Sequence, residues 1–306
     1  MLSIVVNFYN NRREALATLY SLTRGYQQHA RDLPYEVLAV DNGSSEPLSE
    51  AEVRAFGPEF RYRYVQTSSV SPVQAINAAC RDAAGEQLLV IIDGAHILSP
   101  GVLSLANAAF RLFRTPFVAT VSFHLGPNKQ NLSILEGYNQ EAEDELLRRA
   151  GWKENGYRLY TVTGDYSDES GGWFGYLFES GCFGIRKDDY FAMGGFDERF
   201  LSRGGGLVNL DFFQRALSRQ DLEYVILLGE GTFHQIHGGV ASNAPPTQHP
   251  WAEFHEEYVR IRGQQFQRVP RRPFFMGMLP EEALHIAKNS AENGLRFWQQ
   301  SPASRQ

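Results

Sequence analysis

A run of consecutive aliphatic residues that ends at an acid constrains the fold more than any other feature of this chain. The run is Leu88-Leu89-Val90-Ile91-Ile92, and Asp93-Gly94-Ala95-His96 follows it. An unbroken apolar segment of this length is typical of a strand buried on both faces, as in a parallel sheet. Open α/β folds bind ligands at the carboxyl edge of such a sheet. We therefore expect Asp93 and His96 at a ligand-binding edge.

Two interpretations of this strand end stay open. A strand-ending Asp commonly caps a turn, with a solvated His beside it, and taken alone the pair fits that interpretation better. The two side chains also suit a divalent cation that holds a diphosphate, because a carboxylate is a hard ligand and an imidazole a borderline one.

The first half of the chain alternates between strand and helix patterns. The predicted strands cover residues 3–7, 35–40, 62–66 and 88–93, and the predicted helices cover residues 11–26, 46–56 and 72–84. Strands separated by helices of this length predict a doubly wound α/β fold with a right-handed, mostly parallel sheet.

The pattern changes after residue 117. It predicts strands over 118–125 and 225–228, helices over 141–149, 210–218, 251–262 and 280–298, and a glycine hinge at 204–206. The aromatic, acidic and glycine-rich segment 161–178 is typical of a loop over a site. We expect an α/β domain over residues 1–240, in halves 1–117 and 118–240, and a C-terminal helical extension over 241–306.

Composition excludes several classes of protein. The net charge of −6 provides no basic stripe for nucleic acid. Cys80 and Cys182 lie far apart without metal-like spacing, so we expect reduced, buried thiols. The chain opens on a strand-like segment, and no stretch reaches the length of a membrane span. We expect a cytoplasmic protein, with peripheral docking at the inner membrane face left open.

Four segments, taken in order, resemble those of GT-A glycosyltransferases, most closely the nucleotide-sugar-dependent family 2. They are residues 3–10 (SIVVNFYN), 40–45 (VDNGSS), 77–93 and 181–200. The resemblance covers about residues 2–240 and depends on the order and spacing of the segments. It implies a GT-A fold, Rossmann-like with a mostly parallel central sheet. The half at 1–117 would bind nucleotide and the half at 118–240 would bind acceptor.

The resemblance also implies a nucleotide site. Its residues would be Asn7, Tyr9, Asp41, Asn77 and Asp93, with Asn7 and Asp41 holding base and ribose. The sequence around Asp41 is equally a good turn and helix start, which is its ordinary structural role.

The expected metal site departs from the family pattern. Where family 2 usually has Asp-x-Asp, the second acid is replaced by Ala95, and His96 follows one residue later. We expect Mn²⁺ or Mg²⁺ to be held by Asp93 and His96 with His234 or His237, His234 being favoured because it is closer to a strand end. Solvated histidines are the alternative.

A metal-independent variant is a second alternative for this site. In it a basic residue neutralises the phosphate. The residues considered are Arg186, Lys187 and Arg203.

The segment expected to carry the general base also differs from the family pattern. Family 2 often shows Glu-Asp-x-Asp where this chain has Val208-Asn209-Leu210-Asp211. Asp211 is the remaining acid there, and its alternative role is a helix N-terminal Asp stabilised by exposed amides. Glu179 is expected to contact donor sugar or acceptor.

Three aromatic residues are further candidates for the acceptor site. Trp173, Phe174 and Tyr176 suit the apolar faces of a sugar. Ordinary packing is the alternative for each.

The resemblance implies an enzyme that moves a sugar from a nucleoside-diphosphate sugar, of the UDP-hexose class, to a hydroxyl of a glycan or small molecule, with inversion. A bacterial-type surface or secondary-metabolite glycan is the expected product. An oxidoreductase would show Gly-x-Gly-x-x-Gly after the first strand, where Asn7-Phe8-Tyr9-Asn10 stands. A nucleotidyltransferase would show a basic glycine-rich loop there. A degenerate, non-catalytic domain that binds carbohydrate or a partner protein stays open, as does a homo-oligomer.

Overall fold

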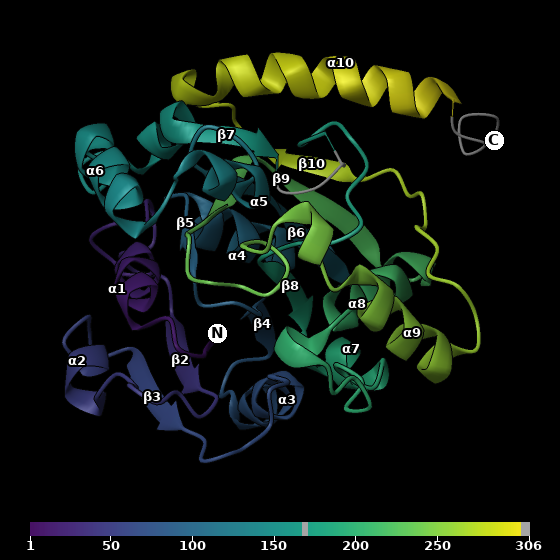
Figure 1. The fold of residues 1–306 in the computed structure, drawn as a ribbon, viewed down its shortest axis with the longest axis horizontal. Helices are drawn as coiled ribbons and strands as arrows, with labels where there is room; N and C mark the ends of the chain where they lie inside the picture. The colour runs from purple at the N-terminus through teal and green to yellow at the C-terminus, as the bar shows by residue number, and fades with distance from the viewer. Residues whose placement is uncertain (167–170, 301–306) are drawn as a thin grey trace.

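The chain folds around one twisted sheet with helices packed on both of its faces (Figure 1). The structure, a computed structural model, describes residues 1–166 and 171–300. Within these residues the strand order is β10-β9-β6-β8-β4-β1-β2-β3, while β5 pairs with β9 and β7 pairs with β6. The doubly wound, mostly parallel fold predicted from the sequence is confirmed.

The N-terminal half provides the regular parallel part of the sheet. Its strands are β1 (Leu2–Phe8), β2 (Tyr35–Asp41), β3 (Phe60–Tyr64) and β4 (Gln87–Ile91). Its helices are α1 (Arg12–Ser21), α2 (Glu50–Arg54), α3 (Val73–Asp82) and α4 (Val102–Leu112). Since Phe8 pairs with Asp41 and Val6 with Ile91, the carboxyl ends of β1, β2 and β4 reach the same edge.

The alternation of side chains along β1 explains the double winding. Ile4 and Val6 belong to the apolar cluster that contains Leu19 of α1 and Leu103 of α4. Val5 belongs to the opposite cluster, with residues of α3 and of α8. Successive side chains of a strand point to opposite faces, so an all-apolar strand requires helices on both.

The second half is mixed. Its strands are β6 (Pro116–Leu125), β7 (Thr163–Tyr166), β8 (Phe183–Arg186) and β9 (Glu223–His234), and the short β5 (His96–Leu98) of the first half pairs with β9. Its helices are α5 (Gln130–Ser133), α6 (Gln140–Ala150), α7 (Lys187–Ala192) and α8 (Val208–Ser218). Strand β8 runs antiparallel between β4 and β6. His234 of β9 lies opposite both His96 of β5 and His124 of β6, so the register sets three imidazoles abreast.

Two predicted boundaries differ from the structure for physical reasons. The helix predicted over 11–26 ends at Ser21 as α1, because the following residues are held elsewhere: Tyr26 donates to the Leu98 carbonyl and the Gln28 amide to that of Pro100. The strand predicted over 225–228 continues to His234, because Gly229 makes an irregularity at φ +81° rather than a strand end.

The C-terminal tail extends both the helical layer and the sheet. Both predicted helices are present, as α9 (Trp251–Arg262) and α10 (Leu284–Gln300), and α10 crosses the upper edge of the molecule in Figure 1. Strand β10 (Phe274–Gly277) was not predicted and pairs in parallel with β9. Residues beyond the predicted boundary at 240 therefore complete the edge of the central sheet.

Cys80 and Cys182 are free, buried thiols, as predicted. Burial raises the pKa of each to about 12. Among the described residues, no helix combines the length and the apolar character needed to cross a membrane.

Glu230 of β9 makes folding stability depend on pH. The carboxylate is buried and accepts hydrogen bonds from the Ser99 hydroxyl, the Gly101 amide and the Tyr157 hydroxyl. Burial nevertheless raises its pKa from 4.5 to about 7. The native state therefore binds more protons than the unfolded chain between these values, and stability falls as the pH rises through that window.

We expect the Glu230 contribution to lower the free energy of unfolding by about 2–3 kcal/mol between pH 4.5 and pH 7. Urea denaturation of the wild type and of Glu230→Gln over this range checks the prediction. The free energy of unfolding of the variant should decline less steeply with pH than that of the wild type, even if the variant is less stable at every pH. Parallel pH profiles for the two proteins would contradict the prediction.

Candidate functional site

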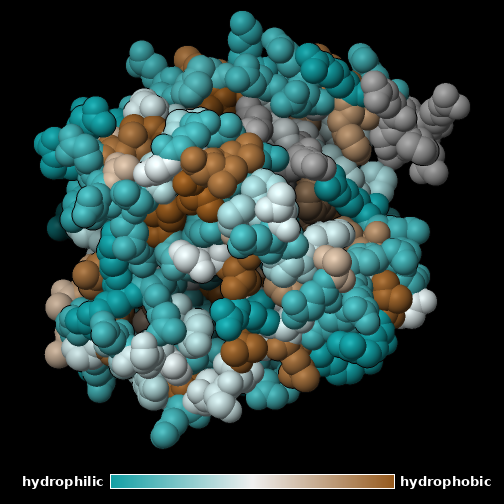
Figure 2. All heavy atoms as spheres, in the orientation of Figure 1, coloured by the Kyte–Doolittle hydropathy of each residue, from teal (hydrophilic) through white to brown (hydrophobic). Residues whose placement is uncertain are grey.

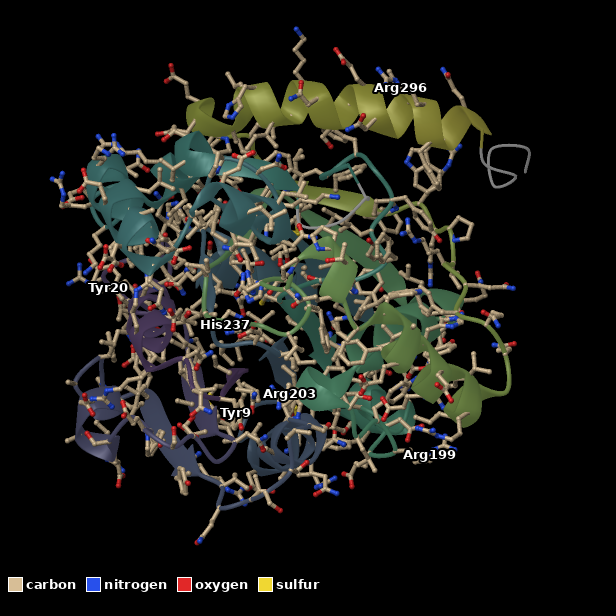
Figure 3. All side chains as sticks on the ribbon, viewed as in Figure 1. Tyr9, Tyr20, Arg199, Arg203, His237 and Arg296 are labelled. Carbon is tan, nitrogen blue, oxygen red and sulfur yellow. The ribbon has the colours of Figure 1, made fainter. Side chains whose placement is uncertain are left out.

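A cavity of about 670 Å³ opens at the carboxyl edge of the parallel strands. Residues from the ends of β1, β4, β6 and β9 line it together with the segments 203–209 and 237–242. Polar residues mixed with a few apolar ones cover the middle of this face in Figure 2, and the labelled Tyr9, Arg203 and His237 lie around the cavity in Figure 3. The predicted site residues that line the cavity are Asn7, Tyr9, Asp93, His96, Glu179, Arg203, His234 and His237.

Asp93, His96 and His234 converge in this cavity. Their nearest possible ligand atoms all lie within 4.8 Å of one another. Asp93 follows β4 by two residues, His96 begins β5, and His234 ends β9 directly opposite His96. The antiparallel pairing of β5 with β9 therefore turns His96 back toward Asp93, although the second acid of the family motif is absent.

His237 completes the cluster from the loop after β9. Its Nε2 lies 3.0 Å from Asp93 Oδ2 and 3.2 Å from His234 Nε2. His234 Nε2 lies 3.4 Å from the same Asp93 oxygen. The side-chain arrangement predicted for residues 93, 96, 234 and 237 is therefore present, and the solvated alternative for the two later histidines is not.

The protonation of the cluster suits a cation. Burial lowers the pKa of His234 to about 3 and also lowers the pKa of His96, so both rings are neutral at pH 7. Burial acts in the opposite direction on Asp93, but His237 and His234 outweigh it and hold the Asp93 pKa well below its usual range. Burial likewise lowers the pKa of His237, but Asp93 outweighs it and the net shift is upward.

The donor set fits a divalent transition-metal ion. A neutral imidazole and an ionised carboxylate are the ligand forms that bind such ions. The Nδ1 of His96 lies 3.0 Å from the Asp93 carbonyl oxygen, which only accepts, so Nδ1 carries the hydrogen and Nε2 has the lone pair.

Gly181 leaves room for His96 Nε2. A methyl group at this position would lie 2.9 Å from that nitrogen and 2.5 Å from Ser122 Oγ, both under normal contact distance. We expect Gly181→Ala to displace the imidazole and to weaken Mn²⁺ binding at least tenfold, by analogy with the loss of a group that orients a ligand.

Titration calorimetry with Mn²⁺ checks this prediction. Gly25→Ala is the control, because a methyl group there meets no atom within 4 Å. Unchanged Mn²⁺ affinity in Gly181→Ala would show that His96 is not a ligand.

The nucleotide side of the cavity contains unsatisfied amide oxygens. Asn7 and Asn11 are buried cavity residues whose Oδ1 atoms find no hydrogen-bond partner among the described residues. A buried acceptor of this kind is costly unless a ligand supplies the donor. Tyr9 lies at the rim and is 41% exposed.

Two residues predicted for the nucleotide site do not line the cavity. Asp41 Oδ1 accepts from the Ser44 amide at 2.7 Å, which is the turn role considered as its alternative. Asn77 accepts from the Tyr190 hydroxyl and donates to the Phe196 carbonyl, so it ties α3 to the segment before α8.

The two predicted catalytic acids have different surroundings. Glu179 lines the cavity. Asp211 does not: it is 1% exposed and pairs with Arg215 at 2.8 Å and with Arg262 at 2.5 Å. Asp211 lies outside the cavity and both of its carboxylate oxygens are held by guanidinium groups, so this placement argues against Asp211 as the base.

The three aromatic residues proposed for the acceptor pack against other parts of the protein, with Trp173 and Tyr176 buried and Phe174 half-buried. Trp173 is fully buried and donates to the Glu230 carbonyl at 2.8 Å, Tyr176 stacks on Phe297 of α10 at 4.5 Å, and Phe174 packs on a tail phenylalanine. None of them lines the cavity. Their ordinary packing alternative therefore describes them, and residues 167–170 of the predicted loop lie outside the described residues.

Of the three basic residues considered for binding phosphate, one lines the cavity and two do not. Arg203 lines the cavity. Arg186 donates to the carbonyls of Phe110 and Arg114, and Lys187 donates to carbonyls at the end of α3, so both act as structural ties.

Several cavity residues were missed in the sequence. His124, Lys129, Asn131 and His249 line the cavity and were not predicted. His124 had a usable signal, because Ser122 and His124 alternate with apolar residues in β6 and so share one face. Asn131 lies within the four-residue helix α5, and Lys129 and His249 flank very short helices, where sequence spacing gives no direction.

The family model described as Glycosyl transferase family 2 matches residues 3–180, more than half of the chain. The chain belongs to glycosyl transferase family 2. It is accordingly a nucleotide-sugar-dependent glycosyltransferase, and its GT-A fold is the one the resemblance implied. A search of curated protein sequences finds no match.

Solved structures of Staphylococcus aureus TarS share the fold. TarS 1–349 in complex with UDP-GlcNAc is 18% identical with a TM-score of 0.53, and the match covers 99% of this chain and 74% of that one. TarS 1–349 in complex with UDP is 16% identical with a TM-score of 0.52, covering 99% and 73%. The longer TarS structure is 16% identical with a TM-score of 0.51, and the match spans 44% of its length.

Proposed function

We propose that this chain transfers a sugar from a UDP-hexose to a hydroxyl of a glycan or small-molecule acceptor, with inversion and with a bound divalent cation. The observation that carries the proposal is the convergence of Asp93, His96 and His234 within 4.8 Å beside a cavity at the carboxyl edge of the sheet. The TarS structures in complex with UDP and with UDP-GlcNAc support a UDP sugar as the donor.

The cation site is built from Asp93, His96 and His234, with His237 beside them. A cation bound there supplies positive charge to the departing diphosphate. The chain adds its own positive charge: Lys129 and Arg203 line the same cavity, and neither has an ion pair or side-chain hydrogen bond among the described residues. Mn²⁺ is favoured over Mg²⁺, because imidazole ligands suit transition metals and Mg²⁺ prefers oxygen.

The nucleotide is proposed to contact the cavity wall formed by the ends of β1 and β4. The Oδ1 atoms of Asn7 and Asn11 would accept hydrogen bonds from N–H or hydroxyl groups of the nucleotide, which would relieve their burial without a partner. Tyr9 at the rim would cover the base.

Glu179 is proposed as the general base. An inverting transfer requires removal of a proton from the acceptor hydroxyl, and a carboxylate in the cavity performs it. Asn209, which stands where the family often has an acid, also lines the cavity but has no titratable proton. The acceptor would therefore enter on the side of Glu179 and Asn209, within residues 118–240.

Thermal unfolding with UDP, GDP and dTDP, each with and without Mn²⁺, tests the proposal. We expect stabilisation by UDP that increases with Mn²⁺ and disappears in His96→Ala, because a ligand that binds only the native state raises its stability. Stabilisation by UDP that is equal with and without Mn²⁺ would support the metal-independent alternative. If no nucleoside diphosphate shifts the melting temperature at saturation, the proposal is wrong.

A further inference from the structure

The carboxamide of Gln130 contacts His234 twice. Gln130 is the first residue of α5 and is fully buried. Its Nε2 donates to the His234 carbonyl oxygen at 2.8 Å, and its Oε1 lies 2.7 Å from His234 Nδ1. Because a carbonyl oxygen only accepts, the atom facing it must be the amide nitrogen. The atom facing Nδ1 is then an acceptor, so Nδ1 carries the ring hydrogen.

Asn243 requires the same orientation from the other side. Its Oδ1 accepts from the backbone amides of His237, Gly238 and Gly239 at 3.0, 2.9 and 3.0 Å. Its Nδ2 is thereby left to donate to Gln130 Oε1, at 3.0 Å. The hydrogen bonds form a chain from Asn243 through Gln130 to His234. Backbone amides fix the direction at the Asn243 end and the His234 carbonyl fixes it at the other, because backbone groups cannot exchange donor and acceptor roles.

We propose that Gln130 is a positioning residue that holds His234 as the Nδ1–H tautomer and so presents the Nε2 lone pair to the cation. The inference rests on the cation site of the proposed function. Gln130 does not line the cavity and acts only through His234. Histidines that bind metals generally donate their other ring N–H to such a fixed acceptor.

Loss of the Gln130 acceptor would favour the other tautomer. His234 Nε2 lies 3.4 Å from Asp93 Oδ2, an acceptor that would attract a hydrogen on Nε2. With that hydrogen in place Nε2 has no lone pair for a metal. The side chain of Gln130 therefore decides which of two neutral forms of one ring faces the cluster.

Two measurements on the same proteins test the inference. Two-bond ¹H–¹⁵N spectra of histidine-labelled, metal-free protein report the tautomer of His234, and titration calorimetry reports the affinity for Mn²⁺. The variants are Gln130→Leu, which removes the acceptor, and Gln130→Glu, which keeps an acceptor at Nδ1. Gln27→Leu is the matched control: Gln27 is also buried, donates to the carbonyls of Ser21 and Ser99 and accepts from the Leu103 amide.

We expect the Nδ1–H tautomer in the wild type and in Gln130→Glu. In Gln130→Leu the hydrogen should move to Nε2 and Mn²⁺ affinity should fall about 10–100-fold, the usual effect of losing a residue that orients a metal ligand. Gln27→Leu should lose stability without either change.

Three results would overturn the inference. An Nε2–H tautomer in the wild-type protein would do so without any variant, and thus even if Gln130→Leu failed to fold. Equal Mn²⁺ affinity in the wild type and Gln130→Leu would overturn the inference and leave the proposed cation site intact. No Mn²⁺ binding by the wild type would remove the cation site and the inference together.

Discussion

Replacing Asp93 by Asn is expected to lower kcat/KM at least about 10³-fold and to abolish the effect of Mn²⁺ on UDP binding. Asp93 is the carboxylate of the cluster, and its Oδ2 lies 3.0 Å from His237 and 3.4 Å from His234. The amide removes the negative charge that balances a cation among the imidazoles, and charge stabilisation of a leaving group is commonly the largest catalytic contribution.

Steady-state kinetics at several Mn²⁺ concentrations measures the effect of this substitution. Asp82→Asn is a suitable control, because Asp82 is 61% exposed and pairs with Arg63 at the surface. An Asp93→Asn enzyme that keeps more than a tenth of wild-type activity would show that the cluster is structural.

Replacing Glu179 by Gln is expected to lower kcat about 10²–10⁴-fold with a much smaller change in KM, since a general base acts mainly in the transition state. The substitution keeps the size of the side chain and removes its ability to take a proton. Transfer to the acceptor and hydrolysis of the donor should be measured separately. A base at Glu179 would take the proton from the acceptor hydroxyl in the first reaction and from water in the second, so both rates should fall.

Asp211→Asn distinguishes the two candidate bases. It weakens the buried contacts to Arg215 and Arg262, so we expect a loss of about 3 kcal/mol in the free energy of unfolding. The kcat of the folded fraction should be unchanged. The reverse pattern, a stable Asp211→Asn with low kcat and an active Glu179→Gln, would assign the base to Asp211.

The alternation of strands and helices was predictable from the sequence because it depends on local periodicity. The apolar runs of β1, β2 and β4 were each predicted as strands, that of β4 as a strand buried on both faces, and the apolar residues of all three are buried in the structure. The convergence of Asp93, His96 and His234 was predictable for a related reason: each lies at or near the end of a strand, and strand ends meet at the edge of a sheet.

Several of the predicted site residues that lie away from the cavity are held there by contacts between distant segments. Tyr176 looks like a residue that stacks on a sugar until Phe297 of α10, more than a hundred positions later, stacks on it. Trp173 looks the same until the carbonyl oxygen of Glu230 in β9 accepts its indole N–H. Asp211 looks like a base until Arg262 of α9 reaches it. No local pattern shows which side chain will cover another, so these contacts were beyond prediction.

The candidate metal site has imidazoles where the family motif has a second carboxylate. Ala95 removes the second acid, and the pairing of β5 with β9 supplies two imidazoles in its place, His96 and His234. The substitution exchanges a hard oxygen ligand for borderline nitrogen ligands. We therefore expect Mn²⁺ to support activity better than Mg²⁺.

A crystal structure with UDP and Mn²⁺, with anomalous diffraction recorded for manganese, tests the central claim most directly. We predict one strong anomalous peak bonded to Asp93, His96 and His234 and to the diphosphate of UDP, with the nucleoside against Asn7 and Asn11. A diphosphate bound in the cavity with no manganese near these three residues, or a peak elsewhere, would contradict the account.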